Sequence, residues 1–292
     1  MAQNDSAVLT AAVGYVYTGP VGTAPPTPAA LKTLDVTSYG SQVQTVKITG
    51  APTGGTFTLT VGAQTTAAIT YNATTAAVKS ALELLSTVGV GNVLVTGTSI
   101  SDANGFDVTW TGAKSGTSQT ITATPSLTGG TSPTVAVTLK TAASGWKSVG
   151  HTSRGTLPEF GFEGDSTEIR GSWQKKKLRE IQKDDPIDYL SVILHQFDKD
   201  ALSLYYGPNA SSTSGVFGVS SSSQNTNAEA AGLVIIQDGA MRLGFHFSKA
   251  AVKRDDKIEL PIDDLAALPI KFTFLDYGTE LLFSWINEDL FA

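Results

Sequence analysis

The chain has 292 residues, enough for two hydrophobic cores, and carries 20 Lys and Arg against 26 Asp and Glu, a formal net charge of −6. It contains no Cys, which excludes disulfides, thiolate metal sites and Cys nucleophiles. A surface of this sign does not bind nucleic acid tightly. Without a long apolar stretch or an N-terminal targeting signal, we expect a chain made in the cytoplasm with no membrane partner.

The first 40 residues include a Pro-rich segment, in which Pro20, Pro25, Pro26 and Pro28 closely follow Tyr17. Pro restricts its own backbone and that of the preceding residue to extended conformations. Segments of this composition act as semi-rigid spacers with few internal contacts. We therefore predict an extended arm here.

The composition changes abruptly after residue 40. Residues 41–142 contain 25 Thr, four aromatic and seven charged residues among 102 positions, and their net charge is +1, whereas residues 143–292 carry −6. Surface loop tips are where a folded domain tolerates an insertion. We predict a discontinuous host domain of residues 1–40 and 143–292, with residues 41–142 inserted as a second domain.

Within the insert, Thr and Val alternate with apolar residues at the period of a strand. A helix interrupts the strands, with Asn72 as its expected N-cap and an apolar stripe at Val78, Ala81, Leu82 and Leu85. We expect a small α+β module, mostly antiparallel sheet. The predicted strands cover residues 43–48, 56–61, 92–96, 106–111, 119–124 and 134–139.

The pattern of residues 143–292, the second segment of the host domain, also predicts strands. Two hairpins among them each have a polar face. The run 167–174 places Ile169 and Trp173 on one face and four polar residues on the other. The run 241–248 repeats this alternation, and Asp238-Gly239 before it is a strong hairpin signal. The polar positions are Glu168, Arg170, Ser172, Gln174, Arg242, Gly244, His246 and Ser248.

The rest of this segment predicts strands near 188–197, 270–275 and 280–286. Asp198 is placed to cap a short helix that ends at Gly207. The Ser-rich and Asn-rich residues 207–230 predict a mobile loop. The predicted fold class of the host domain is therefore mainly β with a short helix.

No catalytic or metal-binding pattern stands out, and we expect neither an enzyme nor a cofactor. His151, His195 and His246 are dispersed without metal-ligand spacing. The Asp pairs at 184–185, 255–256 and 263–264 are best explained as turn and cap residues, and Asp102 to Gly105 as a tight turn. The basic run 175–179 predicts a solvated hairpin tip or a subunit contact.

Segments on both sides of the insert resemble one protein family. They are residues 14–28 (GYVYTGPVGTAPPTP), 145–155 (GWKSVGHTSRG) and 160–164 (FGFEG), supported by residues 172–175 and 193–197. On these residues the chain resembles the major tail proteins, the tail-tube subunits, of long-tailed phages of actinobacteria. In such a family residue 145 would follow the arm directly, so the residues that intervene here support the insertion.

The resemblance implies a tail-tube-type β-sandwich or barrel that forms stacked hexameric rings around a channel for DNA ejection. It implies tape-measure and tail-terminator proteins as partners beside the chain itself. The arm, with Tyr17, Pro20, Pro25, Pro26 and Pro28, would lie along or between rings. The polar hairpin faces suit a water-filled lumen with transient, non-specific passage of double-stranded DNA. We expect the lumen to be lined by several of Glu168, Arg170, Ser172, Gln174, Arg242, His246 and Ser248.

The insert has small, flexible ends, and we expect it to fold independently. We also expect it to decorate the outside of the tube, where the surface of the bacterial cell is a candidate partner. An alternative is an adhesive or carbohydrate-binding β protein, in which Tyr71, Phe106 or Trp110 stacks on sugar rings; otherwise these aromatics form the core of the insert. A hydrolase on a β scaffold has less support, because no catalytic cluster is present.

Overall fold

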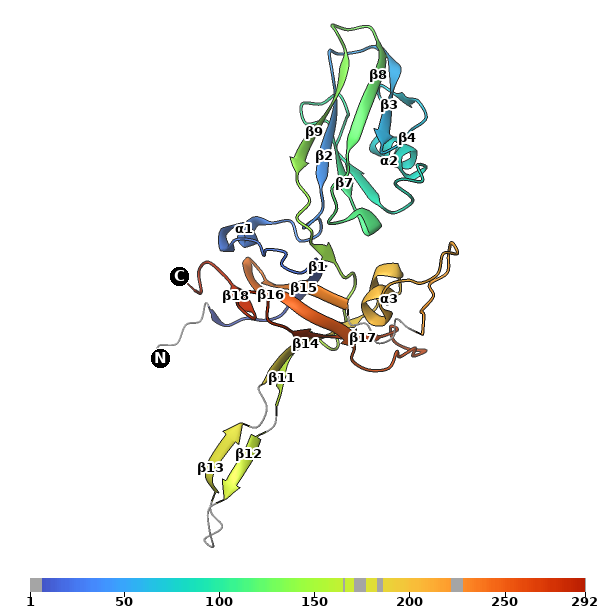
Figure 1. Cartoon of the computed structure of the whole chain (residues 1–292). Coiled ribbons are helices and arrows are strands. Elements are labelled where there is room, and N and C mark those ends of the chain that lie inside the picture. The colour runs from blue at the N-terminus through green and yellow to red at the C-terminus, as the bar shows by residue number, and fades with distance from the viewer. Residues whose placement is uncertain (1–6, 165, 171–176, 183–185, 222–227, 292) are drawn as a thin grey trace. The chain divides into compact units, whose positions relative to one another are not determined.

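The computed structural model describes residues 7–164, 166–170, 177–182, 186–221 and 228–291. The chain divides into two compact units (Figure 1). Unit 1 consists of Met1–Thr33 and Ser148–Ala292, and unit 2 of Leu34–Lys147. Antiparallel sheets dominate both units, which confirms the mainly β class.

Unit 1 is built on one eight-stranded, mainly antiparallel sheet. Its strand order is β10-β1-β15-β16-β17-β14-β11, and β18 also pairs with β16. The long strand β16 therefore has β15 along one side and, along the other, first β18 and then β17. The strands are β1 (Val13–Gly19), β10 (Lys147–Ser148), β11 (Glu159–Glu163), β14 (Ile187–Leu194), β15 (Ala228–Asp238), β16 (Met241–Arg254), β17 (Leu268–Phe274) and β18 (Ser284–Ile286).

The predicted hairpin between β15 and β16 is confirmed. Asp238 pairs with Met241 across a two-residue loop, in which Gly239 has a φ of 57°. Such a left-handed conformation is what Gly allows at a tight hairpin turn. A register shift between Ala230 and Gly232 marks a bulge further along the pair.

The core of unit 1 lies on the face of this sheet that carries Phe245, Phe247 and Phe272. Helix α3 (Lys199–Tyr206) contributes Ala201 and Tyr205 to the same core. Its predicted caps are confirmed: the Asp198 carboxylate accepts hydrogen bonds from two backbone amides of the first turn, and Gly207 ends the helix with a φ of 91°.

A second hairpin of unit 1 consists of β12 (Ser166–Arg170) and β13 (Lys177–Gln182). This pairing confirms the predicted strand for its first part. The remaining positions of that strand, with Ser172 and Gln174, lie outside the described residues, as do Lys175 and Lys176 of the basic run.

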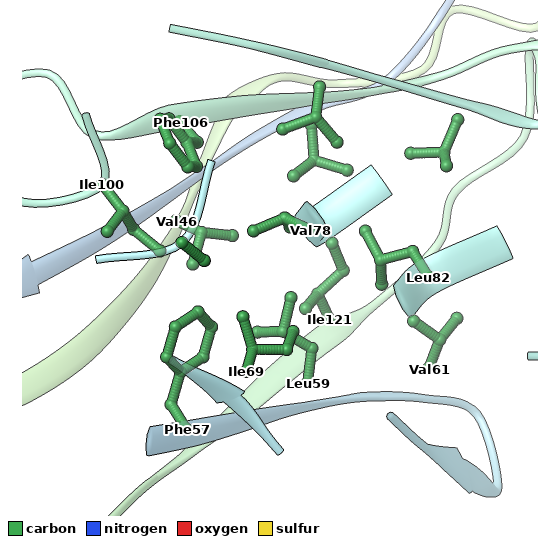
Figure 2. Close-up of a cluster of buried hydrophobic side chains, with 14 of the residues drawn as sticks. Val46, Phe57, Leu59, Val61, Ile69, Val78, Leu82, Ile100, Phe106 and Ile121 are labelled. Atoms are coloured by element: carbon green, nitrogen blue, oxygen red, sulfur yellow. The ribbon is translucent and has the colours of Figure 1, made fainter. Parts of the chain in front are cut away.

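Unit 2 contains two four-stranded sheets around its own core. One has the order β6-β7-β2-β9; in the other β4, β5 and β8 all pair with β3. The core fills with Phe57, Leu59 and Phe106, each fully buried (Figure 2). The strands are β2 (Val43–Thr49), β3 (Gly54–Val61), β4 (Gln64–Thr65), β5 (Ile69–Thr70), β6 (Val93–Thr96), β7 (Phe106–Trp110), β8 (Ile121–Thr128) and β9 (Thr134–Thr141).

Helix α2 (Thr75–Glu83) closes this core with Val78 and Leu82, as the apolar stripe predicts. The expected cap at Asn72 is wrong. The N-cap is Thr74, whose hydroxyl accepts a hydrogen bond from the Ala77 amide. Thr and Asn both serve as N-caps, and the backbone places the start of the helix two residues later than the sequence predicts.

Candidate assembly surfaces

The polar face predicted for β16 is covered. His246 is 6% and Ser248 3% exposed. The His246 Nε2 donates to the Thr23 carbonyl at 3.1 Å, and the Ser248 hydroxyl donates to the Glu280 carboxylate. The Gly22 amide also donates to the Ser248 carbonyl at 2.9 Å. The expectation of open solvent at these two positions is wrong, because residues 20–24 fold back over this part of the strand.

Burial changes the acid–base behaviour of His246. Desolvation lowers the pKa of this imidazole, and the hydrogen bond to the Thr23 carbonyl and the nearby Glu280 charge only partly offset that effect. The neutral imidazole is therefore favoured in the folded chain. Its contact with Thr23 ties the Pro-rich segment to the sheet.

The Pro-rich segment is packed rather than extended and free. Tyr17 lies within β1, pairs with Leu233 of β15 and is 1% exposed, so placing it in an arm is wrong. Pro26 is buried and Pro25 half-buried, whereas Pro20 is exposed.

Pro28 is the first residue of helix α1 (Pro28–Thr33), a position that suits Pro because the missing N–H has no intrahelical partner there. The Thr27 hydroxyl accepts a hydrogen bond from the Ala30 amide at the start of this helix. Leu31 is the buried residue of this helix, with its side chain 1% exposed. Neither β1 nor α1 is predicted from the sequence, because Pro residues favour an extended segment.

The other lumen candidates differ from His246 and Ser248. Arg242 is half-buried, and its Nη1 donates to the Leu31 carbonyl at 3.2 Å. Glu168 and Arg170 lie on β12, opposite Glu180 and Lys177 in register. Ser172 and Gln174 lie outside the described residues.

A pocket of about 390 Å³ lies where β16 begins. Three segments wall it: helix α1, the turn before β16 and the C-terminal residues 287–290. Lys32 forms salt bridges of 2.7 Å with Glu288 and 2.8 Å with Asp289. Asn287 donates to the Arg242 carbonyl at 2.8 Å, which joins the C-terminal segment to β16. The apolar wall residues are Pro28, Ala240, Met241 and Leu290.

A loop with exposed apolar side chains follows the other end of β16. Leu260 is 74% exposed, Leu265 63%, and Ile262 is fully exposed. Glu259 and Ala267 form an isolated antiparallel bridge at the base of this loop. We refer to residues 260–266 as the apolar loop. Contiguous exposed apolar residues mark interaction sites more often than single ones.

Aromatic side chains form a third exposed surface. Phe160 of β11 and Trp285 of β18 are about two-fifths exposed and cover the buried Phe245, with ring centroids 4.6 Å and 4.7 Å from it. Phe162, further along β11, is 74% exposed. β11 is the last strand of the sheet in the described part of the chain, so its outer edge has no strand beside it there. Such edges pair readily with another chain.

The family model described as phage tail tube protein matches residues 1–45 and 113–292. The chain belongs to the phage tail tube protein family. It is 46% identical over 291 residues to the major tail protein Gp23 of Mycobacterium phage L5 and 47% identical over 292 residues to that of Mycobacterium phage D29. Each alignment covers 100% of this chain and 96% of the relative. The chain is thus a structural protein of the phage tail, as the sequence resemblance predicted.

Unit 2 of this tail tube protein offers little of the aromatic surface that sugar stacking needs. Phe106 and Trp110 are fully buried, and the Trp110 indole donates to the Gln44 amide oxygen at 3.1 Å. Tyr71 is partly buried against the same core. The alternative in which Phe106 or Trp110 binds sugar is wrong, because these rings are the core of the unit.

The acidic residues singled out from the sequence form hydrogen bonds where the structure describes them, and Asp184 and Asp185 lie outside the described residues. The Asp264 carboxylate accepts a hydrogen bond from the Leu265 amide, and Asp255 accepts one from the Ser191 hydroxyl. The Gly105 amide donates to the Asp102 carbonyl in a turn between β6 and β7. Among the residues with described positions, no three His, Asp or Glu gather as metal ligands. No described helix is long and apolar enough to cross a membrane.

Proposed function

We propose that this protein polymerises through unit 1 into stacked rings, six copies to a ring, and that the stack is the tail tube through which double-stranded DNA passes. The observation that carries the proposal is membership of the tail tube family together with the exposed apolar surfaces of unit 1. A structural, non-enzymatic role follows. Tape-measure and tail-terminator proteins are the further partners of this proposal.

We assign the lumen to the hairpin β12–β13 rather than to β16. Glu168 and Arg170 remain candidates on this hairpin, whereas His246 and Ser248 are buried within unit 1. Ser172 and Gln174, which lie outside the described residues, stay candidates on the sequence pattern alone. The net charge of −6 supports passage of DNA without tight binding, because a polyanion is repelled by a surface of its own sign. Glu168→Lys should then increase retention of duplex DNA by assembled tubes, whereas His246→Gln should not.

We propose that unit 2 decorates the outside of the tube and is not needed for ring formation. The surface of the bacterial cell is its candidate partner. Its separate core supports this role. We propose boundaries further out than residues 41 and 142, at the ends of unit 2. Trp146 is fully buried, and a Cβ on Gly40 would meet its backbone carbonyl at 2.0 Å, so Gly40 and Trp146 pack together within unit 2.

Electron microscopy of the purified protein in negative stain tests the proposal. The full chain should form tubes or rings, and a variant in which a Gly-Ser linker joins Thr33 to Ser148 should form tubes of reduced outer diameter. Residues 34–147 expressed alone should show a cooperative thermal transition by circular dichroism. A monodisperse monomer for the full chain would contradict the tube role. Failure of the linked variant alone would place unit 2 in the assembly interface.

A further inference from the structure

We propose that the apolar loop of one copy inserts into the pocket at the start of β16 of the next copy, so that neighbouring subunits of the tube join head to tail. This inference rests on the proposed tube function and specifies one contact that holds the tube together. The inserting side chains are Leu260, Ile262 and Leu265. The receiving residues are Pro28, Ala240, Met241 and Leu290.

The apolar loop is held in place from within unit 1. At its base, the amides of Glu259 and Ala267 each donate to the other residue's carbonyl, at 3.1 Å and 2.9 Å. The His195 Nδ1 donates to the Ala266 carbonyl at 2.8 Å, and the Tyr205 hydroxyl donates to the Asp256 carbonyl at 2.7 Å. A loop anchored in this way loses little conformational entropy on binding, and its exposed apolar side chains then lower the free energy of association.

The pocket is the right size and chemistry to receive such side chains. Its volume of about 390 Å³ exceeds that of an apolar cavity of about 150 Å³, which is enough to hold a benzene molecule. Two sets of contacts hold the pocket wall in place. Lys32 forms salt bridges with Glu288 and Asp289, and Asn287 donates a hydrogen bond to β16. The pocket therefore exists before a partner arrives.

The two features lie at opposite ends of one strand. The pocket begins at Ala240 and Met241, and the apolar loop follows Arg254, the last residue of β16. At about 3.3 Å per residue, the 14 residues of β16 span on the order of 40 Å, so a loop cannot reach the pocket of its own chain. A contact between two different surfaces leaves the bound pair with a free pocket on one copy and a free loop on the other, and so continues from copy to copy.

A second copy fits the pocket better than other occupants. Each copy brings one loop and one pocket, so the two surfaces match in number in any polymer of this chain. Glu259, Asp263 and Asp264 flank the apolar side chains, and this negative charge disfavours nucleic acid or an anionic lipid surface as the partner of the loop. The pocket rim has Lys32 and Arg242 beside Glu288 and Asp289, so it does not repel an acidic loop as a purely acidic surface would.

Because the chain has no Cys, engineered thiols report the contact directly. Ala240→Cys and Ile262→Cys are combined in one chain, assembled tubes are oxidised, and the products are separated on a non-reducing gel. A disulfide requires Cα atoms within about 7 Å, so the double variant should give a ladder of covalent dimers, trimers and longer species. Each single variant should give no species beyond a dimer. The control pairs Ile262→Cys with Leu84→Cys, since Leu84 is 84% exposed in unit 2.

The inference is overturned if tubes form but the double variant gives no ladder with an oxidant or with a short bismaleimide. Efficient dimerisation of Ile262→Cys alone would also overturn it, because a loop that meets its own copy makes a symmetric contact. Ile262→Asp gives an independent check: the concentration needed for assembly should rise at least tenfold while the circular dichroism spectrum stays unchanged, and Val90→Asp in unit 2 should have no such effect. If the unaltered chain forms no tubes at all, the proposed function itself fails.

Discussion

The two units present different surfaces, although both are mainly antiparallel sheet. Most of the large apolar side chains that the described residues expose lie in unit 1, including Phe162, Leu260 and Ile262. Unit 2 exposes hydroxyls instead. Thr56, Thr58 and Thr60 of β3 lie opposite Ser126, Thr124 and Thr122 of β8 in register. A surface of unit 1 thus resembles one made for association, whereas this face of unit 2 suits contact with water.

The preference of a residue for strands does not decide what the face of the resulting strand contacts. Thr favours strands because it is β-branched, and a strand face made of Thr side chains can stay in contact with water. The outward positions of β3 and β8 carry no charge and no aromatic ring, so each pair of strands is stabilised by its own ladder and by the core beneath it. Unit 1 leaves apolar area at the surface, which only another molecule can cover.

The largest expected effect tests whether the two units fold separately. Trp110→Ala should destabilise unit 2 by about 3–5 kcal/mol, because a fully buried Trp is removed and the Gln44 side chain loses its partner. Differential scanning calorimetry should show one transition lowered and the other unchanged. A single transition that shifts as a whole would show that the units are energetically coupled.

A slightly smaller effect tests the packing of the Pro-rich segment. Leu31→Ala should cost about 2–5 kcal/mol in unit 1, since Leu31 is 1% exposed between helix α1 and the sheet. Deletion of residues 17–33, which also removes the buried Tyr17, should then prevent unit 1 from folding. Urea denaturation measures both. Leu84→Ala, at an exposed position, should stay within about 0.5 kcal/mol of the unaltered chain.

The N-cap of helix α2 offers an effect of about 1 kcal/mol. Thr74→Ala removes the hydroxyl that accepts from the Ala77 amide and should lower the stability of unit 2 by about 0.5–2 kcal/mol. Asn72→Ala should have a smaller effect, because Asn72 is not the cap. Thermal unfolding of residues 34–147 distinguishes the two variants, and equal losses would contradict the cap assignment.

The smallest effect concerns pH. The pKa of His246 is lowered from its usual 6.5 by burial, so the unfolded chain takes up a proton at a higher pH than the folded one. The contribution to stability is complete above pH 6.5 and is lost as the pH falls from there through the lower folded value. Chemical denaturation from pH 7.5 to 5 should show this fall. His246→Gln should flatten it, and an unchanged slope in that variant would assign the fall to other groups.

Local sequence patterns determined the elements that depend on near neighbours. The alternation in β3 and β16, the turn at Gly239 and the caps of α3 were all predictable, because a strand face, a tight turn and a helix end each involve residues close in sequence. The amino-acid composition also separated the Thr-rich segment from its neighbours. These predictions needed no knowledge of which strands pair.

Tertiary structure decided what each face meets. β1 pairs with β15, more than 200 residues later in the chain, and the contact of Thr23 with His246 spans a similar separation. Such contacts leave no periodic signal in the sequence, so a polar residue that alternates outward looks solvent-exposed until another segment covers it. The apolar loop and the pocket became candidates for one interface only when β16 placed them at its two ends, because the length of a strand sets that separation and the residues themselves do not.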